Sequence, residues 1–464
     1  MGLATLKGWP HRTPDTGHRT PDTGRLAAGA QTSPPTFGLS PEWLLHDGVP
    51  IADALVLSHP EQQERLKDVC PEAAHTGVLA GDPCFDRMLA ARPYRERFRR
   101  ALGVRPGQRL VVLNSTWNPE SLFGDGGDEN LLPALLPRLT SELPADEYRV
   151  AAVLHPNIWY GHGPGQVRAW LDRARRAGLT LVDPLRHWRQ AILAADAVIG
   201  DHGAVSYYSA AIGAPVLLGA APLAGLDPDS PVADFVAGAP RLDPYGPLAP
   251  QLDQLIAAHR PLAAAAEFTT SVPGQSAALL RRLFYGLMDS PETPDAPTAS
   301  LLPLPRPPYE PARRTAPTLV VTRPTGRPGE VTVTRYADPR GRPWEPGGEV
   351  HMAVHEDVRD PGRLALADVI HREGAPDDPV LGGPARWTAE VLERFAQCGL
   401  AAYVTGADTC TVRTREGSLW CLTGTTGADP ALYASAWYAL LGAGESGFTV
   451  RTGSAVHPVT VTPG

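Results

Sequence analysis

Lysine is almost absent from this chain of 464 residues: only Lys7 and Lys67 occur, so nearly all of its 42 basic residues are arginines. This bias predicts a GC-rich bacterial genome. The 50 acidic residues outnumber the basic ones, and the net charge is −8 at pH 7. An acidic chain lacks the positive surface that binding to a phosphate backbone requires. We therefore expect no nucleic-acid partner.

Cysteine is scarce as well, and its spacing is not that of metal ligands. The five cysteines are Cys70, Cys84, Cys398, Cys410 and Cys421. Cys410 and Cys421 flank a predicted hairpin and could lie near each other across it. The alternative is two buried thiols in a reduced cytosol. We predict no metal site, and no cofactor is implied.

Long apolar segments are missing too. The N-terminus carries no apolar stretch of the signal-peptide kind, so no signal peptide is predicted. The longest uncharged run, residues 203–226, is interrupted by glycines and prolines. It is therefore expected to be a buried core segment and not a membrane span. We expect a cytoplasmic protein without a transmembrane segment, for which peripheral membrane contact stays open.

Proline and glycine are abundant, with 50 and 46 residues. The heptapeptide HRTPDTG at 11–17 is repeated unchanged at 18–24, and a tandem repeat without apolar residues predicts a disordered tail over 1–36. A second Pro-rich stretch, 291–317, is predicted to be a semi-rigid extended linker. The linker separates a long middle segment from a final segment, 318–464.

In the middle segment, short apolar runs alternate with amphipathic stretches, which is typical of parallel strands joined by crossover helices. Strands are predicted at 54–57, 76–80, 110–113, 149–154, 179–182, 197–200 and 215–218, and helices at 59–69 (opened by Ser58), 93–102, 166–177, 187–195 and 205–211. This pattern predicts a doubly wound, Rossmann-like α/β domain, in which ligands bind at the carboxyl ends of the strands. Three loops stand at such ends: 114–118, 155–162 and 201–206.

The final segment predicts a different architecture, an α+β domain of mostly antiparallel strands with two helices. Strands are expected at 318–322, 330–335, 349–354, 400–404, 410–414, 418–422, 447–451 and 456–462, and helices at 387–398 and 431–441. It contains no motif that we can connect to chemistry.

The turn at 201–206 joins a strand to a helix, and the amides of a helix N-terminus attract anions. Small residues at Gly203 and Ala204 would let a phosphate approach the backbone. His202 would add a proton-dependent charge, and Ser206 a hydroxyl. The alternative is a plain capped helix, with Asp201 as N-cap and His202 exposed.

Polar residues also follow two other strands. His155 stands after an apolar strand and could donate to a phosphoryl oxygen, or could simply brace its loop. Asn114, Ser115 and Thr116 offer donors and acceptors. Trp117 offers a face for a base or sugar, or a lid over the core. Polar strand ends that converge on one sheet edge favour a ligand site.

The motifs at these positions resemble those of the CDP-glycerol glycerophosphotransferase family, whose members share a two-lobed GT-B plan with related glycosyltransferases and nucleotide-sugar 2-epimerases. The resemblance covers residues 50–288 and is carried by VLAGDPCFDRM (78–88), VLNSTW (112–117), VLHPN (153–157) and ADAVIGDHGAVSYYSAAIGAPVLL (195–218). It implies that His155 and Asp201, with Ser206 more loosely, hold the phosphates of a donor. Gly203 and Ala204 replace the family's two serines, which favours backbone amides over hydroxyls as the phosphate ligands.

The resemblance also implies a domain plan. Residues 37–88 correspond to a remnant of an N-terminal lobe, and 89–290 to the donor-binding lobe. The acceptor-activating lobe is then mostly missing, as expected for an N-terminally truncated chain or a degenerate paralogue.

Three functions follow from these observations. The leading hypothesis is a transferase, for glycosyl or glycerophospho groups of a cell-envelope polymer, that binds a CDP- or UDP-linked donor, with His155 stabilising the departing phosphate. The second is a non-catalytic binding or scaffold protein that retains the GT-B fold. The third is a nucleotide-sugar 2-epimerase, which would need several carboxylates in its cleft, whereas only Asp201 is a candidate.

Overall fold

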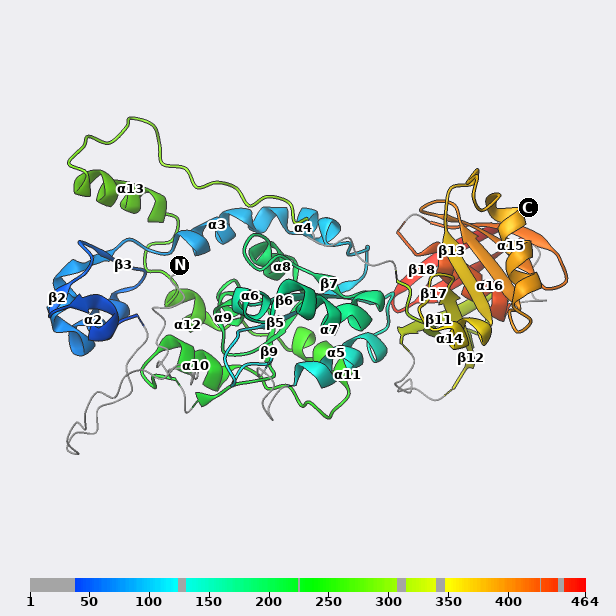
Figure 1. Cartoon of the computed structure of the whole chain (residues 1–464), viewed down its shortest axis with the longest axis horizontal. Helices are drawn as coiled ribbons and strands as arrows, with labels where there is room; N and C mark the ends of the chain where they lie inside the picture. Colours follow the sequence, from blue (N-terminus) through cyan, green and yellow to red (C-terminus); the bar gives the residue numbers. More distant parts are fainter. Residues whose placement is uncertain are drawn as a thin grey trace. The chain divides into compact units, whose positions relative to one another are not determined.

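The computed structural model describes residues 38–123, 131–223, 226–306, 314–338, 347–425, 427–440 and 446–464. The predicted tail 1–36 lies outside these residues. The chain divides into two compact units, whose elements are labelled in Figure 1. The first unit comprises residues 1–93, 200–241 and 260–303, and the second comprises 94–199, 242–259 and 304–464.

The first unit is mainly helical in its described part. Its elements are α1 (Pro41–Leu44), β1 (Leu45–His46), β2 (Val49–Pro50), β3 (Leu55–Leu57), α2 (Pro60–Val69), β4 (Gly77–Leu79), α3 (Pro83–Ala91), α9 (Ala204–Ala211), β9 (Val216–Leu218), α10 (Pro231–Gly238), α12 (Ala263–Glu267) and α13 (Ser276–Leu287). Strands β3 and β4 pair in parallel, as a βαβ unit requires. The N-cap of α2 is His59 and not the predicted Ser58, because the His59 ring accepts the Glu61 N–H.

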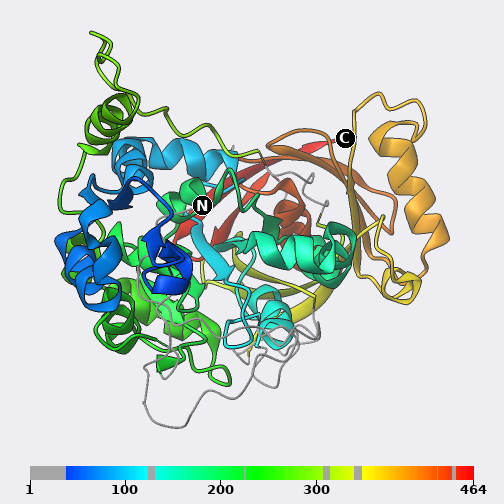
Figure 2. The same ribbon diagram turned by 60° about the vertical axis from the view of Figure 1, so that its left-hand side comes forward.

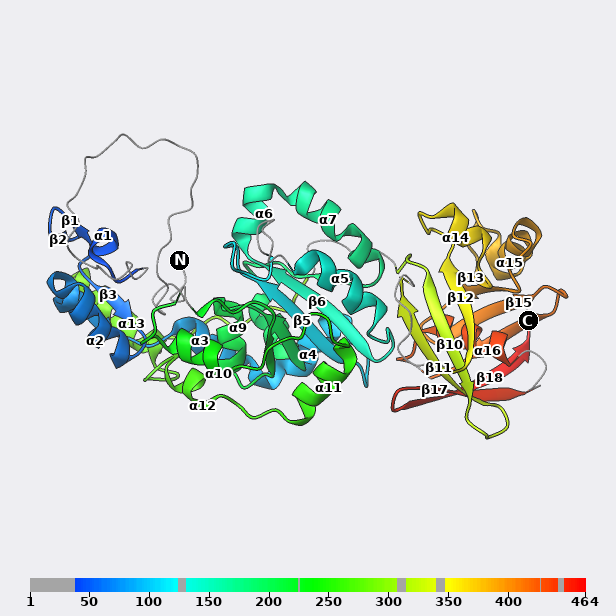
Figure 3. The same cartoon turned by 90° about the horizontal axis from the view of Figure 1, so that it is seen from below.

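The second unit begins with the predicted parallel sheet. Its elements here are α4 (Arg95–Ala101), β5 (Arg109–Ser115), α5 (Leu132–Ser141), β6 (Tyr148–Leu154), α6 (Pro156–His162), α7 (Pro164–Arg176), β7 (Thr180–Leu181), α8 (Trp188–Ala194), β8 (Ala197–Gly200) and α11 (Leu248–Ala257). Strand β5 pairs in parallel with β6 on one side and β8 on the other, and β6 pairs with β7. Figure 3 shows β5 and β6 side by side. The predicted α/β class is thereby confirmed.

The final segment is a closed barrel, which the predicted α+β domain did not anticipate. Among the described residues its strand order is β10-β11-β17-β18-β16-β15-β14-β13-β12. The strands are β10 (Thr318–Pro324), β11 (Glu330–Ala337), β12 (Glu349–His355), β13 (Val369–Glu373), β14 (Leu400–Val404), β15 (Thr409–Thr414), β16 (Leu419–Thr423), β17 (Gly447–Thr452) and β18 (Ala455–Pro463). Closure depends on the parallel pairing of β11 with β17, which joins strands far apart in the sequence.

Helix α16 (Pro430–Ala439) fills the barrel. All its residues from Pro430 to Trp437 are buried, and they form one core with inward residues such as Val333 of β11 and Val412 of β15. A helix that is apolar on every side needs such complete enclosure. Helix α15 (Gly383–Arg394) instead packs Trp387 against outward residues of the sheet, and Figure 2 shows it outside the strands. A short helix, α14 (Pro361–Ala365), and strand β13 were not predicted.

The two cysteines of the predicted hairpin do not face each other. Cys410 of β15 is opposite Leu422, and Cys421 of β16 is opposite Thr411. Because successive residues of a strand point to opposite faces, the two thiols lie on different sides of the barrel wall. Cys410 and Cys421 are both free thiols.

Candidate functional site

The carboxyl ends of β5 and β6 meet in the second unit, as the sequence predicts for neighbouring parallel strands. Strand β5 is longer than expected and includes Asn114 and Ser115. Ser115 is opposite Leu154, and the His155 N–H donates to the Ser115 carbonyl over 3.0 Å. The structure therefore brings loops 114–118 and 155–162 to the same edge of the sheet.

His155 is the N-cap of α6. Its Nδ1 accepts the N–H of Asn157 over 3.1 Å, so the ring braces its loop through one nitrogen. A neutral imidazole with an accepting Nδ1 carries its proton on Nε2. Bracing of the loop uses Nδ1, whereas donation to a phosphoryl oxygen would use Nε2. The first contact fixes Nε2 as the nitrogen that carries the proton.

Trp117 accompanies His155 at this edge. The centroids of the two rings lie 6.4 Å apart with an interplanar angle of 36°. Trp117 is 39% exposed, so part of its surface is open to solvent. An exposed aromatic face next to a donor nitrogen suits a ligand with a flat apolar part and a polar part.

The polar residues before Trp117 are buried and shape the loop. Asn114, Ser115 and Thr116 are each less than a tenth exposed. The Ser115 hydroxyl donates to the Thr116 carbonyl and accepts the Phe123 N–H, both over 2.8 Å. Ser115 therefore acts chiefly on the backbone of the loop that carries Trp117.

The turn at 201–206 belongs to the first unit, and its cap differs from the prediction. Gly203, and not Asp201, is the N-cap of α9, and no side chain caps that helix from the N-cap position. The Asp201 carboxylate instead accepts the Gly203 N–H over 2.9 Å. The Gly203 N–H thus already donates to a carboxylate. The later N–H groups of the first turn, from Ala204 on, are the ones that can donate to an anion.

Two side chains of this turn are more enclosed than expected. His202 is 2% exposed, which corrects the alternative of an exposed histidine, and Ser206 is fully buried. Asp201 is also fully buried. Only Ala204 and Val205 remain half-buried, so any ligand at this turn meets backbone more readily than side chains.

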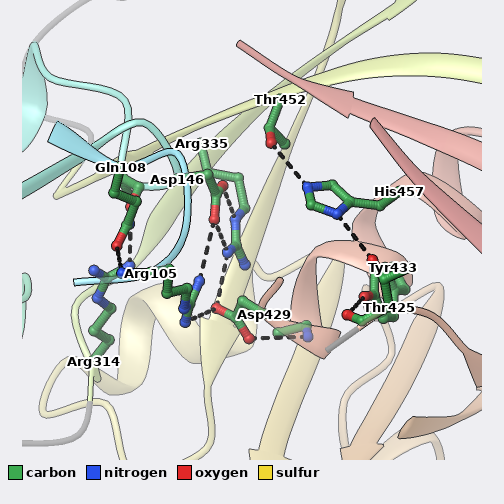
Figure 4. A network of polar contacts seen from close by, with 12 residues as sticks. Arg105, Gln108, Asp146, Arg314, Arg335, Thr425, Asp429, Tyr433, Thr452 and His457 are labelled. Carbon is green, nitrogen blue, oxygen red and sulfur yellow. Dashed lines mark hydrogen bonds and ion pairs between the residues drawn. The ribbon is translucent and has the colours of Figure 1, made fainter. Parts of the chain in front are cut away.

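The second unit contains a buried ionic network that the sequence patterns did not predict (Figure 4). Arg335 of β11 binds Asp146, in the loop before β6, through two hydrogen bonds of 2.7 and 2.6 Å, and it binds Asp429 over 2.8 Å. Arg105 reaches the same two carboxylates at 3.6 and 3.5 Å. Alternation along the strand places Arg335 on the same face as Val331 and Val333. An arginine on an apolar face is the sequence signal that could have indicated a buried ion pair.

Electrostatics identify this network as structural. Burial alone would raise the pKa of Asp146 and Asp429, but the charge of Arg335 outweighs it and holds both below their ordinary values. Burial would likewise lower the pKa of Arg335, and the two carboxylates raise it. Groups locked in their charged forms make poor proton carriers, because general acid–base catalysis needs a pKa near the working pH.

A cavity of about 190 Å³ lies beside the network. Its wall includes Arg105, Arg109 and His457. The His457 ring is hydrogen-bonded to Thr425 and Thr452, and burial lowers its pKa. Arg109 pairs with Asp253. The charged groups of this wall therefore already have partners.

No group of three or more His, Cys, Asp or Glu residues among the described residues could hold a metal ion. No described helix combines the length and the apolarity that crossing a membrane would take.

No family model matches the chain, and no curated protein is similar to it. Among solved structures, the chain is similar to the wall teichoic acid polymerase TagF, with 15% identity and a TM-score of 0.35 over 51% of this chain and 58% of that chain. It is also similar to Anabaena HepE in complex with UDP-glucose (12%, TM-score 0.31, 51% and 64%). A third is the Methanocaldococcus jannaschii UDP-GlcNAc 2-epimerase in complex with UDP-GlcNAc and UDP (13%, TM-score 0.34, 51% and 62%). The chain thus spans less than two thirds of the length of each.

Proposed function

We propose that the protein binds a CDP- or UDP-linked donor and transfers its glycosyl or glycerophospho group. The observation that carries this proposal is His155. Its Nδ1 is committed to the Asn157 N–H, so its Nε2 carries a proton beside the half-exposed Trp117 ring. This pair offers a donor for a phosphoryl oxygen and a face for a base or sugar.

In the proposed reaction, an acceptor hydroxyl attacks the transferred group of the donor, its proton passes to solvent water, and the bond to the nucleotide phosphate breaks. The leaving phosphate gains negative charge as that bond lengthens. A hydrogen bond from His155 Nε2 strengthens as this charge develops, which favours the transition state over the ground state.

The test is designed around the two nitrogens of His155. Asparagine is a good N-cap, so His155→Asn keeps an acceptor for the Asn157 N–H while it removes the Nε2 donor. Losing one hydrogen bond to a charged group costs about 1.5–3 kcal/mol, so we expect binding of CDP or UDP to weaken about tenfold or more. Cytidine and uridine, which lack phosphates, should bind the variant as they bind the unaltered protein.

Calorimetry with CDP, UDP and both nucleosides measures this difference. His46→Ala is the matched control, because the His46 side chain is 84% exposed and pairs with the similarly exposed Asp47 of the same turn. If His155→Asn folds and binds both diphosphates with unchanged affinity, His155 is a loop-bracing residue and lies outside the donor site.

The scaffold hypothesis is the second candidate, and the same experiment separates it from the first. Absence of heat and of a thermal shift with millimolar CDP-glycerol, CDP, UDP-sugars or UDP would favour a non-catalytic binding protein. The epimerase hypothesis depends on Asp201, which is fully buried and accepts the Gly203 N–H, and this arrangement gives that hypothesis less support.

A further inference from the structure

A second cavity of the second unit is lined by arginines. It has a volume of about 220 Å³ and lies among α7, residues 315–317 and the segment 358–363. Four of the described residues that line it are arginines: Arg173, Arg176, Arg359 and Arg363. In a chain with a net charge of −8, four guanidinium groups around one cavity depart sharply from the average surface.

The carboxylates around this cavity do not balance the arginines. Arg173 pairs with Asp338, which is 12% exposed. Arg176 and Arg359 both bind the same oxygen of Asp172. One carboxylate shared between two guanidinium groups leaves several of their N–H donors for another acceptor, since each guanidinium has five.

Arg363 has no such partner among the described residues. The neighbouring Asp360 uses its carboxylate to accept the Arg363 backbone N–H over 3.2 Å, so this contact caps α14 and does not neutralise the guanidinium. Among the described residues, the three carboxylates of Asp172, Asp338 and Asp360 therefore face four guanidinium groups, which leaves an excess of positive charge.

The backbone fixes the walls of the cavity. The Arg176 carbonyl accepts the N–H groups of Thr315 and Ala316 over 3.1 and 3.2 Å, and the Asp338 N–H donates to the Pro317 carbonyl over 2.7 Å. These bonds hold the end of the linker between α7 and the barrel. The arginines of α7 are thus anchored on one side, while Arg359 and Arg363 approach from the other.

We propose that this cavity is a binding site for a phosphate dianion, either inorganic phosphate or the phosphate of a small monoester. Guanidinium groups bind phosphate oxygens through paired, charge-assisted hydrogen bonds, which a compact ammonium cannot provide. A dianion gains about twice the Coulomb energy of a monoanion from the same arginines. The volume suits a phosphate with a small substituent and not a polymer. This site uses none of the residues of the proposed donor site.

Calorimetry on the full chain at constant ionic strength tests the site with sodium phosphate, glycerol 3-phosphate and dimethyl phosphate. We expect the first two to bind and the monoanionic dimethyl phosphate to bind about tenfold more weakly or not at all. The tighter of the first two identifies the source of the phosphate. Equal binding of dimethyl phosphate, or no binding of either dianion, would overturn the proposal.

Variants then locate the site. Arg363→Gln and Arg359→Gln should each weaken phosphate binding about three- to tenfold, since each removes an exposed charge and its hydrogen bonds. The control is Arg386→Gln on α15, because Arg386 is as exposed as Arg359 and pairs with Glu390, neither of which lines this cavity. Unchanged binding by both cavity variants would place the phosphate elsewhere, and an equal loss in Arg386→Gln would show a general charge effect. Either result contradicts the proposal, and neither bears on His155.

Discussion

Arg335 and Asp146 form a two-bonded ion pair that joins barrel strand β11 to the loop before β6. Both side chains are 7% exposed. The neighbouring backbone repeats the connection, since the Ala145 N–H donates to the Arg335 carbonyl over 2.7 Å. Within the second unit, the barrel is therefore attached to the parallel sheet by buried polar bonds as well as by the chain.

Removing one member of this pair should destabilise the second unit strongly. Asp146→Asn leaves the Arg335 charge with only part of its compensation in a buried place, and breaking a buried pair in this way costs about 3–5 kcal/mol. Asp429 remains bound to Arg335, so we expect the lower end of that range. Urea unfolding at pH 7 measures the loss, with Arg386→Gln as a surface-pair control expected to change stability by less than about 1 kcal/mol. Equal effects of the two variants would contradict the structural role of the network.

Acid should weaken the barrel through a buried histidine. Burial lowers the pKa of His351 to about 4, against the opposing effect of the Asp368 carboxylate. The unfolded chain, with a histidine pKa near 6.5, therefore takes up the proton first as the pH falls. Neutral His351 contributes fully to the free energy of unfolding above about pH 6.5. This contribution is lost as the pH falls toward 4, by about 3 kcal/mol at most.

His351→Phe tests this assignment. The ring of His351 lies 4.9 Å from that of Tyr438, and its Nε2 has no hydrogen-bond partner among the described residues. Phenylalanine keeps the aromatic contact and cannot be protonated. Urea unfolding from pH 7 to pH 4 should show a shallower loss of stability for this variant. Part of the slope should persist, because burial lowers the pKa of His371 to about 4 as well. An unchanged slope would assign the acid sensitivity to other groups.

Much of the secondary structure could be predicted from local pattern, and the barrel shows where that information ends. Strand β14 lies at 400–404, as predicted, because its five residues are apolar and buried. Strand β13 was missed, since Val369 and Ile370 are followed by His371, Arg372 and Glu373. Those polar residues are stable there because partners such as His355, which binds Glu373 over 2.9 Å, come from a neighbouring strand.

The candidate site shows the same limit. The positions of Asn114, His155 and Asp201 at strand ends follow from apolar runs that stop there, and a local pattern can reveal such positions. The backbone enters the helix at Gly203 and not at Asp201, and the Asp201 carboxylate accepts the Gly203 N–H, a conformation that the sequence pattern does not encode. The Arg335 network depends on contacts between residues far apart in sequence, and no local pattern encodes those partners.

The turn before α9 gives a further prediction. Asp201→Ala removes the acceptor of the Gly203 N–H and leaves that buried amide without its side-chain partner, at a cost of about 1–3 kcal/mol. Asp201→Asn retains an acceptor oxygen and should lose less. Thermal unfolding of the two variants measures the difference. Identical midpoints for Asp201→Ala and the unaltered protein would show that the turn does not depend on Asp201.

The Pro-rich stretch 291–317 leads to the last prediction. Its described part contains no helix or strand, so limited proteolysis should cut within 291–306 before it cuts inside 100–280. The remaining part, 314–317, is held by the bonds from Thr315 and Ala316 to the Arg176 carbonyl. A cut at 291–306 therefore leaves the Arg335–Asp146 pair and these backbone bonds intact.

We expect the two fragments to elute together in gel filtration under native conditions and to separate in urea. In the Asp146→Asn variant the cut fragments should dissociate more readily. Fragments that separate without denaturant would show that the buried pair does not hold the barrel to the sheet.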